Sequence, residues 1–460
     1  MKVLLIRPKP DKETIGLQHV MICEPLELEY LVSNVPEKLK SEIDIKIYDF
    51  ILEKKSFMEV IREENPDFVA FTGYITHVET IKSLAKEIKQ YNSNIFTAVG
   101  GVHAEVVGED FLDSNIDFIY RRNGIDAFNI TLEGILKSKN IDRIKDDIDR
   151  IREDILEIEK QSYKYKYIHP DRKSVAKYRD DYYYMFHNPC ALMKTSYGCP
   201  YDCSFCFCKE VTSGEYYTRD IEDVVDEIST IKESEIYIVD DNFLFGEERL
   251  KTFIKLLKEK NIKKNYLVYG RADFIAQNKD LMYELKAIGL RAVIVGIESI
   301  RKEDLQNYNK RTTVDINENC IKILKNLDIE LYATMIVPMD FKKKEFNDLT
   351  TWLVNMQVTF VNLQPLTPIP GTDIFDDYKD KLLVAREEYS MFDMAHVILK
   401  PTYLTVREFY IQILKSYYKV IMRPKNSIRL LKKYGLKENI KMLKGSQKVS
   451  FQYLKKIIRG

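Results

Sequence analysis

The regular exchange of short apolar runs for helix-forming stretches most restricts how this chain can fold. It occurs in two blocks, one over residues 1–140 and one over residues 189–380. Strands that alternate with helices predict βαβ units, in which parallel strands are joined by helices that cover the sheet. Each block is therefore expected to be an α/β domain, with its ligands beyond the carboxyl ends of the strands.

The first block carries five predicted strands with helical patterns between them. The strands are Val3–Ile6, Ile45–Tyr48, Phe68–Phe71, Ile95–Val99 and Asp117–Ile119. No Gly-x-Gly-x-x-Gly opens its first helix, so a dinucleotide site is not expected. The block predicts a Rossmann-like, doubly wound domain over residues 1–140 that binds a different ligand.

The second block repeats the strand–helix unit six times, from Leu192–Thr195 to Val358–Leu363. Six repeats are too few for a closed eight-fold barrel and predict a partial (β/α)6 barrel over residues 189–380. Residues 141–188, rich first in charge and then in Tyr, are expected to form a linker with one polar helix. Residues 381–460 are predicted to be helical and basic.

Charge and hydropathy limit the partners. Lys plus Arg and Asp plus Glu both number 71, so no general attraction to nucleic acid is expected. No apolar run approaches the ~18 residues of a membrane span, and the N-terminus does not resemble a signal peptide. A cytoplasmic protein is expected. The basic C-terminal region leaves open a peripheral contact with the inner membrane surface, against the alternative of a solvated face.

Five of the seven cysteines lie between Cys190 and Cys208. Three of them, Cys199, Cys203 and Cys206, form Cys-x3-Cys-x2-Cys directly after the first strand of the second block. Three thiolates on one loop suit a four-iron, four-sulfur (4Fe-4S) cluster with one iron left open, whereas structural zinc takes four ligands. The sequence offers no second Cys-x2-Cys pair downstream, which favours the cluster. The roles of Cys190 and Cys208 stay open.

This loop resembles the hallmark of the radical S-adenosylmethionine (SAM) superfamily, Cys-x3-Cys-x-aromatic-Cys. The resemblance implies that Cys199, Cys203 and Cys206 hold the cluster, and that Phe205 packs against the adenine of SAM. It also implies reductive cleavage of SAM to a radical that removes hydrogen from an unactivated carbon. A low-potential electron donor such as flavodoxin or ferredoxin is expected as a partner.

Further elements at the predicted strand ends fit SAM binding. Asp240 and Asp241 offer acceptors for the methionyl ammonium, although they also suit a helix cap. Arg271 offers a fork for the carboxylate. By resemblance, a Gly-Ile-Glu-Ser element lies against SAM; its predicted contact residues are Gly296, Glu298 and Ser299.

The ends of the third and fourth strands of the first block are rich in glycine, which lets a backbone approach a large flat ligand closely. Together with the cluster loop, the Gly-Gly-x-His-Ala element resembles the cobalamin-binding radical SAM family over residues 1–380. The resemblance implies contacts to the corrin or its nucleotide tail from Thr72, Gly73, Thr76, Gly100, Gly101 and His103. His103 also fits a helix-start residue with a local partner. No His stands in Asp-x-His-x-x-Gly, so a protein His on the lower face of cobalt is not expected.

The leading hypothesis is methyl transfer from methylcobalamin to an unactivated carbon. The alternative is a cyclase or ring-rearranging enzyme that uses the same cofactors without methylation. A tRNA methylthiotransferase would need three further N-terminal cysteines, and residues 1–189 contain only Cys23. A small-molecule, lipid or peptide substrate stays open.

Overall fold

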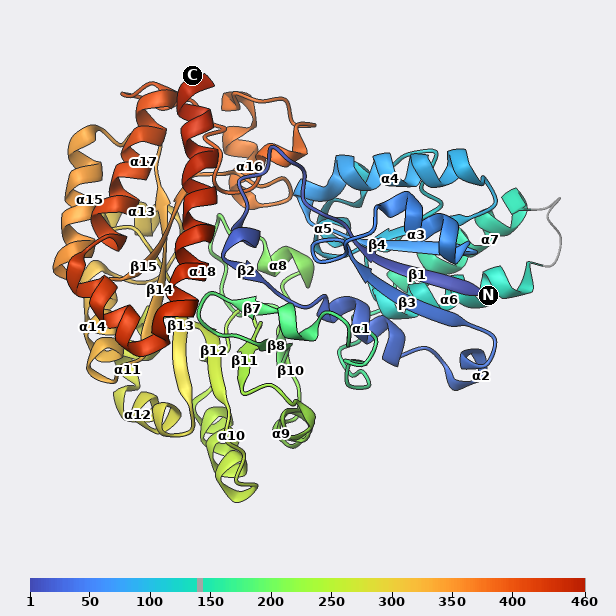
Figure 1. Ribbon diagram of the computed structural model, residues 1–460, viewed down its shortest axis with the longest axis horizontal. Coiled ribbons are helices and arrows are strands. Elements are labelled where there is room, and N and C mark those ends of the chain that lie inside the picture. Colours follow the sequence, from blue (N-terminus) through green and yellow to red (C-terminus); the bar gives the residue numbers. More distant parts are fainter. Residues whose placement is uncertain (139–143, 460) are drawn as a thin grey trace. The chain divides into compact units, whose positions relative to one another are not determined.

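The computed structural model describes residues 1–138 and 144–459 and divides the chain into two compact units. The first unit comprises residues 1–14 and 24–181, and the second comprises residues 15–23 and 182–460. Each unit is built on a parallel sheet with helices packed against it (Figure 1). The predicted linker at 141–188 differs from this division, because residues 144–181 belong to the first unit.

The sheet of the first unit has the order β3-β1-β4-β5-β6 and is parallel throughout. Val3 to Ile6 are fully buried, as expected for a strand that helices cover on both faces. Strand β3 pairs with β1 on one side, and the chain then crosses to add β4, β5 and β6 on the other side. The carboxyl ends of β1 and β4 therefore flank a topological switch point, where such folds bind ligands. The strands are β1 (Lys2–Arg7), β3 (Asp44–Asp49), β4 (Phe68–Thr72), β5 (Phe96–Gly100) and β6 (Phe118–Ile119).

Helices of the first unit form where apolar residues recur at helical spacing. In α4 (Val78–Tyr91) the buried face repeats at Val78, Ile81, Ala85 and Ile88. The predicted polar helix is α7, and it packs against α6. The remaining helices are α1 (Leu26–Ser33), α2 (Glu37–Lys40), α3 (Phe57–Glu64), α5 (Val102–Val107), α6 (Gly124–Lys137) and α7 (Ile144–Glu159).

The main sheet of the second unit has the order β15-β14-β13-β12-β11-β8, parallel and sequential in the chain. This is the predicted partial (β/α)6 barrel, and the predicted α/β fold class is confirmed for both units. The strands are β8 (Cys190–Met193), β11 (Glu235–Ile238), β12 (Asn265–Gly270), β13 (Leu290–Glu298), β14 (Glu330–Val337) and β15 (Phe360–Pro365).

The strands of this sheet present alternate residues to its two faces. Ile236 and Ile238 belong to the core beneath the helices, so Tyr237 between them lies on the inner face. The helices are α8 (Cys208–Val211), α9 (Ile221–Thr230), α10 (Glu247–Glu259), α11 (Ala272–Gln277), α12 (Lys279–Ala287), α13 (Lys302–Asn307), α14 (Val314–Asn326), α15 (Lys343–Asn355) and α16 (Asp373–Tyr378).

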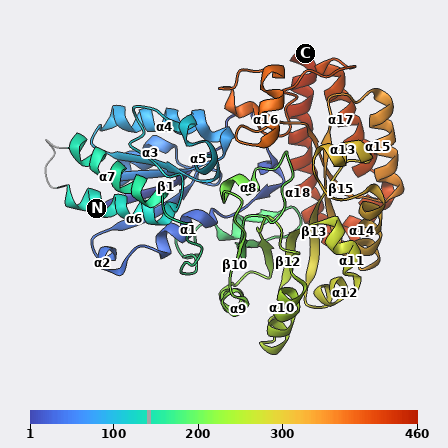
Figure 2. The same ribbon diagram turned by 180° about the vertical axis from the view of Figure 1, so that it is seen from behind.

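The C-terminal region forms two long helices that lie side by side (Figures 1 and 2). A capping box of Thr405 and Glu408 starts α17 (Val406–Ile421), which buries Phe409 and Ile413. Helix α18 (Pro424–Arg459) is interrupted at Gly435. Two short pairs complete the unit: β2 (Met21–Ile22) with β7 (Tyr183–Tyr184), and β9 (Ser196–Tyr197) with β10 (Tyr217–Thr218). Among the described helices, none combines the length and apolar content of a membrane span.

Candidate functional site

The loop with the three predicted cluster ligands runs from β9 to α8, beyond the carboxyl end of β8. Cys203 is buried, while Cys199 and Cys206 are half-buried, and all three are free thiols. Burial raises the pKa of the Cys199 thiol to about 11. A hydrogen bond from Cys208 lowers the pKa of Cys206. The charges of Cys203 and Cys206 also act to raise the pKa of Cys199, so the three thiols are near enough to influence one another. Among the described residues, however, no three His, Cys, Asp or Glu side chains are spaced as the ligands of a single metal ion.

A segment after α13 clamps this loop from one side. The Ser204 amide donates to the Tyr308 carbonyl (3.2 Å), and the Asn309 side-chain amide donates to the Asp202 carbonyl (3.1 Å). The Phe205 ring meets Tyr308 edge-on, with centroids 5.6 Å apart. The predicted adenine-contacting ring is therefore held in place by a neighbour from another part of the barrel.

The segment that follows β15 holds the loop from the other side. The Ile374 amide donates to the Ser204 carbonyl (3.3 Å), and Lys209 pairs with Asp373 (2.6 Å). These contacts join the two edge strands of the open sheet, β8 and β15, through the loops that follow them. Contacts from both sides therefore fix the position of the cysteines.

Asp240, one of the two acidic residues predicted to contact SAM, is used by the protein itself. It is fully buried at the end of β11, and its carboxylate accepts hydrogen bonds from the amides of Thr195 (2.6 Å) and Ser196 (3.0 Å) and from the Thr195 hydroxyl. These bonds fix the chain just before the cluster loop. Asp241 is less buried, and its carboxylate lies 3.9 Å from the Lys194 ammonium.

Arg271 follows β12 and also has protein partners. Its guanidinium pairs with Asp273 (3.0 Å), donates to the Lys310 carbonyl (2.6 Å) and lies over the Tyr201 ring. One of its nitrogens is 3.9 Å from the Cys203 sulfur. A cation at this distance from a thiolate stabilises its negative charge, which is how outer-shell groups tune a cluster.

The remaining predicted SAM contacts gather at the end of β13. Glu298 is buried with a left-handed backbone (φ 62°), which is strained for this residue type. A Cβ at Gly296 would stand 2.0 Å from the Glu298 carboxylate, so a larger residue here would displace the Glu298 side chain. Ser299 donates to Asp304 (2.6 Å) and therefore has a structural partner.

Lys310 is a site residue that the sequence reasoning missed. Its buried ammonium pairs with Glu298 (2.9 Å) and lies 5.8 Å from the centre of the Phe205 ring. Burial acts to lower the pKa of Lys310, but the charges of Glu298 and Cys203 raise it above its ordinary value. The residue follows no strand and stands in no motif; its only sequence signal is a lone Lys in the loop after α13.

Asn242 supplies an independent test of whether a polar ligand fits the carboxyl edge of the second sheet, just beyond β11. It follows Asp240 and Asp241 and is almost fully buried, yet both polar atoms of its side chain have no partner among the described residues. A buried amide without hydrogen bonds costs about 1–3 kcal/mol unless a ligand or water satisfies it. The edge therefore fits a ligand with donors and acceptors, such as the amino-acid end of SAM.

The inner face of the sheet is lined with aromatic side chains. Tyr237 and Tyr332 project from β11 and β14, and Tyr184 of β7 packs on both, with ring centroids 4.9 Å and 5.8 Å away. Phe360 of β15 meets Tyr332 at 5.0 Å. The Tyr-rich stretch before β8 thus contributes Tyr184 to the inside of the barrel.

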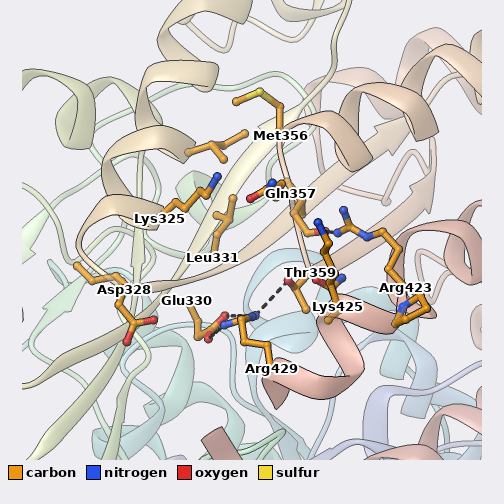
Figure 3. Close-up of a pocket in the computed structure, with 15 residues that line it drawn as sticks. Lys325, Asp328, Glu330, Leu331, Met356, Gln357, Thr359, Arg423, Lys425 and Arg429 are labelled. Atoms are coloured by element: carbon orange, nitrogen blue, oxygen red, sulfur yellow. Dashed lines mark hydrogen bonds and ion pairs between the residues drawn. The ribbon is translucent and has the colours of Figure 1, made fainter. Parts of the chain in front are cut away.

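A cavity of about 660 Å³ lies at the opposite, amino end of β14 and β15 (Figure 3). Its two arginines have protein partners: Arg429 pairs with Glu330 and donates to Thr359 (3.1 Å), and Arg423 donates to the Val354 carbonyl (3.0 Å). Residues at this end of such barrels usually serve stability. The cavity therefore does not belong to the carboxyl-edge site.

In the first unit, the predicted cobalamin contacts meet at the carboxyl ends of β4 and β5. The Gly73 amide donates to the Gly100 carbonyl (3.3 Å). Gly101 has φ 100°, and a Cβ there would stand 3.0 Å from the Thr72 hydroxyl and 3.1 Å from Gly73. Thr76 is half-buried in the short turn that follows. This glycine edge presents bare backbone, as a large flat ligand requires.

The histidine of this edge has a partner within the protein. His103 is buried in α5, with Nε2 2.8 Å from the Asp110 carboxylate and its ring against Phe111. His77 is also buried; its Nδ1 accepts from the Tyr74 amide, and burial lowers its pKa to about 4. In contrast, the large Tyr74 ring is 60% exposed beside Gly73. The edge therefore combines bare backbone with one protruding aromatic ring.

Comparison with known proteins identifies a different family in each of the two units. The B12 binding domain model matches residues 3–131, and the Radical SAM superfamily model matches residues 193–353. The hopanoid C-3 methylase of Methylococcus capsulatus is 27% identical over 90% of this chain and 79% of its own length. The anaerobic magnesium-protoporphyrin IX monomethyl ester cyclase of Cereibacter sphaeroides is 24% identical over 82% of this chain and 63% of its own length.

A solved structure shows the same fold. TsrM, a radical SAM methyltransferase from Kitasatospora setae with cobalamin and a 4Fe-4S cluster bound, matches with a TM-score of 0.65 over 99% of each chain, at 14% identity. The two domain matches, the relatives that span both domains and the cysteine loop agree. The chain therefore belongs to the cobalamin-binding radical SAM enzymes, and its cofactors are cobalamin, a 4Fe-4S cluster and SAM.

Proposed function

We propose that this enzyme methylates an unactivated carbon of an apolar organic substrate. The observation that carries the proposal is the 27% identity to a hopanoid C-3 methylase, which extends over both the B12 binding and radical SAM parts of the chain. When bound, the cluster would supply the electron that cleaves one SAM, and cobalamin would carry to the substrate a methyl group taken from a second SAM. The aromatic inner face made by Tyr184, Tyr237 and Tyr332 suits a polycyclic or lipid substrate better than a charged one.

The roles of the site residues follow from their contacts. Cys199, Cys203 and Cys206 bind the cluster, and Phe205 provides a flat surface for adenine. Asp241 and Asn242 bind the amino-acid end of SAM, because both follow β11 and the buried Asn242 amide has no partner among the described residues. Asp240 and Arg271 act as positioning residues, since their side chains are held by protein groups. Glu298, with Lys310 against it, borders the proposed SAM site beside Phe205.

In the first unit, we propose that the corrin lies on the glycine edge. Gly73, Gly100 and Gly101 approach the ring with backbone only. Thr76 offers a hydroxyl to its amides, and Thr72, whose hydroxyl donates to Glu27 (3.0 Å), offers only an acceptor. His103 positions α5 through Asp110 instead of binding cobalt. Radical SAM enzymes need a reductant; we propose a flavodoxin or ferredoxin for this role, and the cytoplasmic location stays a prediction.

The second candidate function is ring closure without methylation. It is favoured by the 24% identity to an anaerobic magnesium-protoporphyrin cyclase over 82% of this chain. The same three cofactors and the same apolar inner face would serve both reactions, so the two functions must be distinguished by their products.

The test is anaerobic turnover of the reconstituted enzyme with SAM carrying an isotope-labelled methyl group. A hopanoid and magnesium-protoporphyrin IX monomethyl ester are offered in parallel, and products are read by mass spectrometry. Transfer of the label to the hopanoid is expected. If the porphyrin instead loses hydrogens and gains no carbon, the proposed methylation is wrong and the enzyme is a cyclase.

Two variants serve as controls. Cys206→Ala should abolish both deoxyadenosine release and product, because the cluster loses one of its three ligands. Cys190→Ser changes a buried thiol outside the loop and should retain both. Label transfer that survives in Cys206→Ala would contradict the assignment of the cluster.

A further inference from the structure

Helix α18 carries two apolar faces, of which one is covered. After the interruption at Gly435, Met442, Tyr453 and Ile457 are buried, with the Tyr453 ring 6.0 Å from Tyr410 of α17. On the outer side, six large apolar residues are between 41% and 79% exposed. They are Leu436, Ile440, Leu443, Phe451, Leu454 and Ile458. Exposed apolar stripes of this size mark interaction surfaces.

The positions of these residues form one continuous stripe. Counting Gln447, they follow one another at steps of four, three, four, four, three and four residues. Six steps cover 458 − 436 = 22 residues, roughly 3.7 residues per step, which is close to the 3.6 residues per turn of an α-helix. A left-handed coiled coil with a second copy would need a strict 3.5-residue repeat. The stripe therefore does not suit a left-handed coiled coil with a second copy, and it is about 33 Å long.

Lysines border the stripe on one side. At 100° per residue, Lys437, Lys444, Lys448 and Lys455 fall within one flank of it, and all four are exposed. Glu438 is the only acidic residue of α18. A second copy of this helix would bring lysines against lysines, whereas a surface of anionic headgroups would complement them.

We propose that the outer face of residues 436–459 binds an anionic lipid bilayer. The apolar stripe lies at the boundary of headgroups and acyl chains, and the lysine flank contacts lipid phosphates. Helix α17 presents no comparable stripe, because Phe409, Ile413 and Val420 are buried and Tyr418 alone among its large apolar residues is half exposed. The surface is separate from the SAM site, so docking does not depend on which reaction the enzyme catalyses.

The experiment is vesicle co-sedimentation of the full-length protein. Vesicles of phosphatidylcholine alone are compared with vesicles that also contain phosphatidylglycerol. Binding to the anionic vesicles should be at least about tenfold tighter and should weaken as salt is raised. The triple variant Leu443→Ser, Phe451→Ser, Leu454→Ser should bind about tenfold more weakly, and folding should persist because all three side chains are exposed.

A matched pair of charge variants tests the lysine flank. Lys437→Gln, Lys444→Gln, Lys448→Gln should reduce binding, while Lys255→Gln, Lys258→Gln, Lys344→Gln removes the same charge from α10 and α15 and should not. Deoxyadenosine release in vesicle-free buffer should be equal in all variants, which separates this surface from the proposed reaction. Equal vesicle binding by the serine variant and the native protein would overturn the proposal, as would a dimer that only the serine variant fails to form.

Discussion

At the scale of single residues, the site depends on charges that are buried in pairs. Lys310 and Glu298 lie on different elements, 2.9 Å apart, with both side chains almost fully out of water. Burial of one such charge without its partner is costly, because the interior cannot replace its hydration. The pair therefore fixes the loop after α13 to the end of β13, beside Phe205.

We predict that Lys310→Met lowers the free energy of unfolding by about 3 kcal/mol, because it leaves Glu298 buried and unpaired. The double variant Lys310→Met, Glu298→Gln removes both charges and should recover part of the loss. Urea unfolding monitored by circular dichroism measures both. Equal stability of the single variant and the native protein would show that the pair contributes little.

Asp240 gives a second prediction at this scale. Asp240→Asn weakens the acceptors of the Thr195 and Ser196 amides, so we expect a loss of about 2 kcal/mol and a lower iron content after reconstitution. Its neighbour provides the control: Asp241→Asn should keep stability and iron but bind SAM more weakly. If the two variants retain iron equally and lose stability equally, the separate roles of Asp240 and Asp241 are wrong.

At the scale of elements, the clamp at Tyr308 and Asn309 positions the cluster loop through hydrogen bonds from a different part of the barrel. Asn309 has φ 48°, a left-handed conformation that Asn tolerates better than most residues. The side chain of Asn309 and its backbone conformation therefore contribute separately to the position of the cluster loop.

Two substitutions separate these contributions. Asn309→Gly keeps the left-handed backbone but removes the bond to the Asp202 carbonyl, whereas Asn309→Ala removes both. We expect faster loss of cluster absorbance under air for both variants, with the Ala variant faster. If cluster lifetime in the Gly variant equals that of the native protein, the side-chain bond does not hold the loop.

The elements themselves were largely predictable. Apolar periodicity located the five strands of the first sheet and the six of the second, because strands covered by helices read as short apolar runs. The cysteine loop could be found because its chemistry dictates its spacing. The functional split between Asp240 and Asp241 could not, since adjacent carboxylates look alike until backbone partners are known. Lys310 was missed because its loop meets the cluster loop only in the folded chain.

At the scale of the whole molecule, ion pairs tie distant segments within each unit. In the first unit, burial acts to raise the pKa of Glu53, but hydrogen bonds from Lys177 and Tyr178 lower it to about 2. The pKa of Glu64 is likewise lowered to about 2: burial acts to raise it, but hydrogen bonds from Lys46 and Tyr48 lower it. Both carboxylates thus ionise more readily in the folded state than in the unfolded chain.

The sign of the pH dependence follows. The folded pKa values lie below the unfolded value of 4.5, so their stabilisation is complete above pH 4.5 and is lost as the pH falls toward 2. We predict that the urea midpoint of the first unit decreases between pH 4.5 and pH 3. Glu53→Gln should flatten this decrease, while Glu87→Gln, on the exposed side of α4, should leave it unchanged.

The anchoring of the cysteine loop by Asp373 and Ile374 has a consequence for biogenesis. The ribosome releases the three thiols long before it has made the segment that follows β15, so a partly synthesised chain exposes them without their supports. Iron insertion is then expected to come after the last barrel strand has joined the sheet. Maturation factors would therefore meet an almost finished barrel.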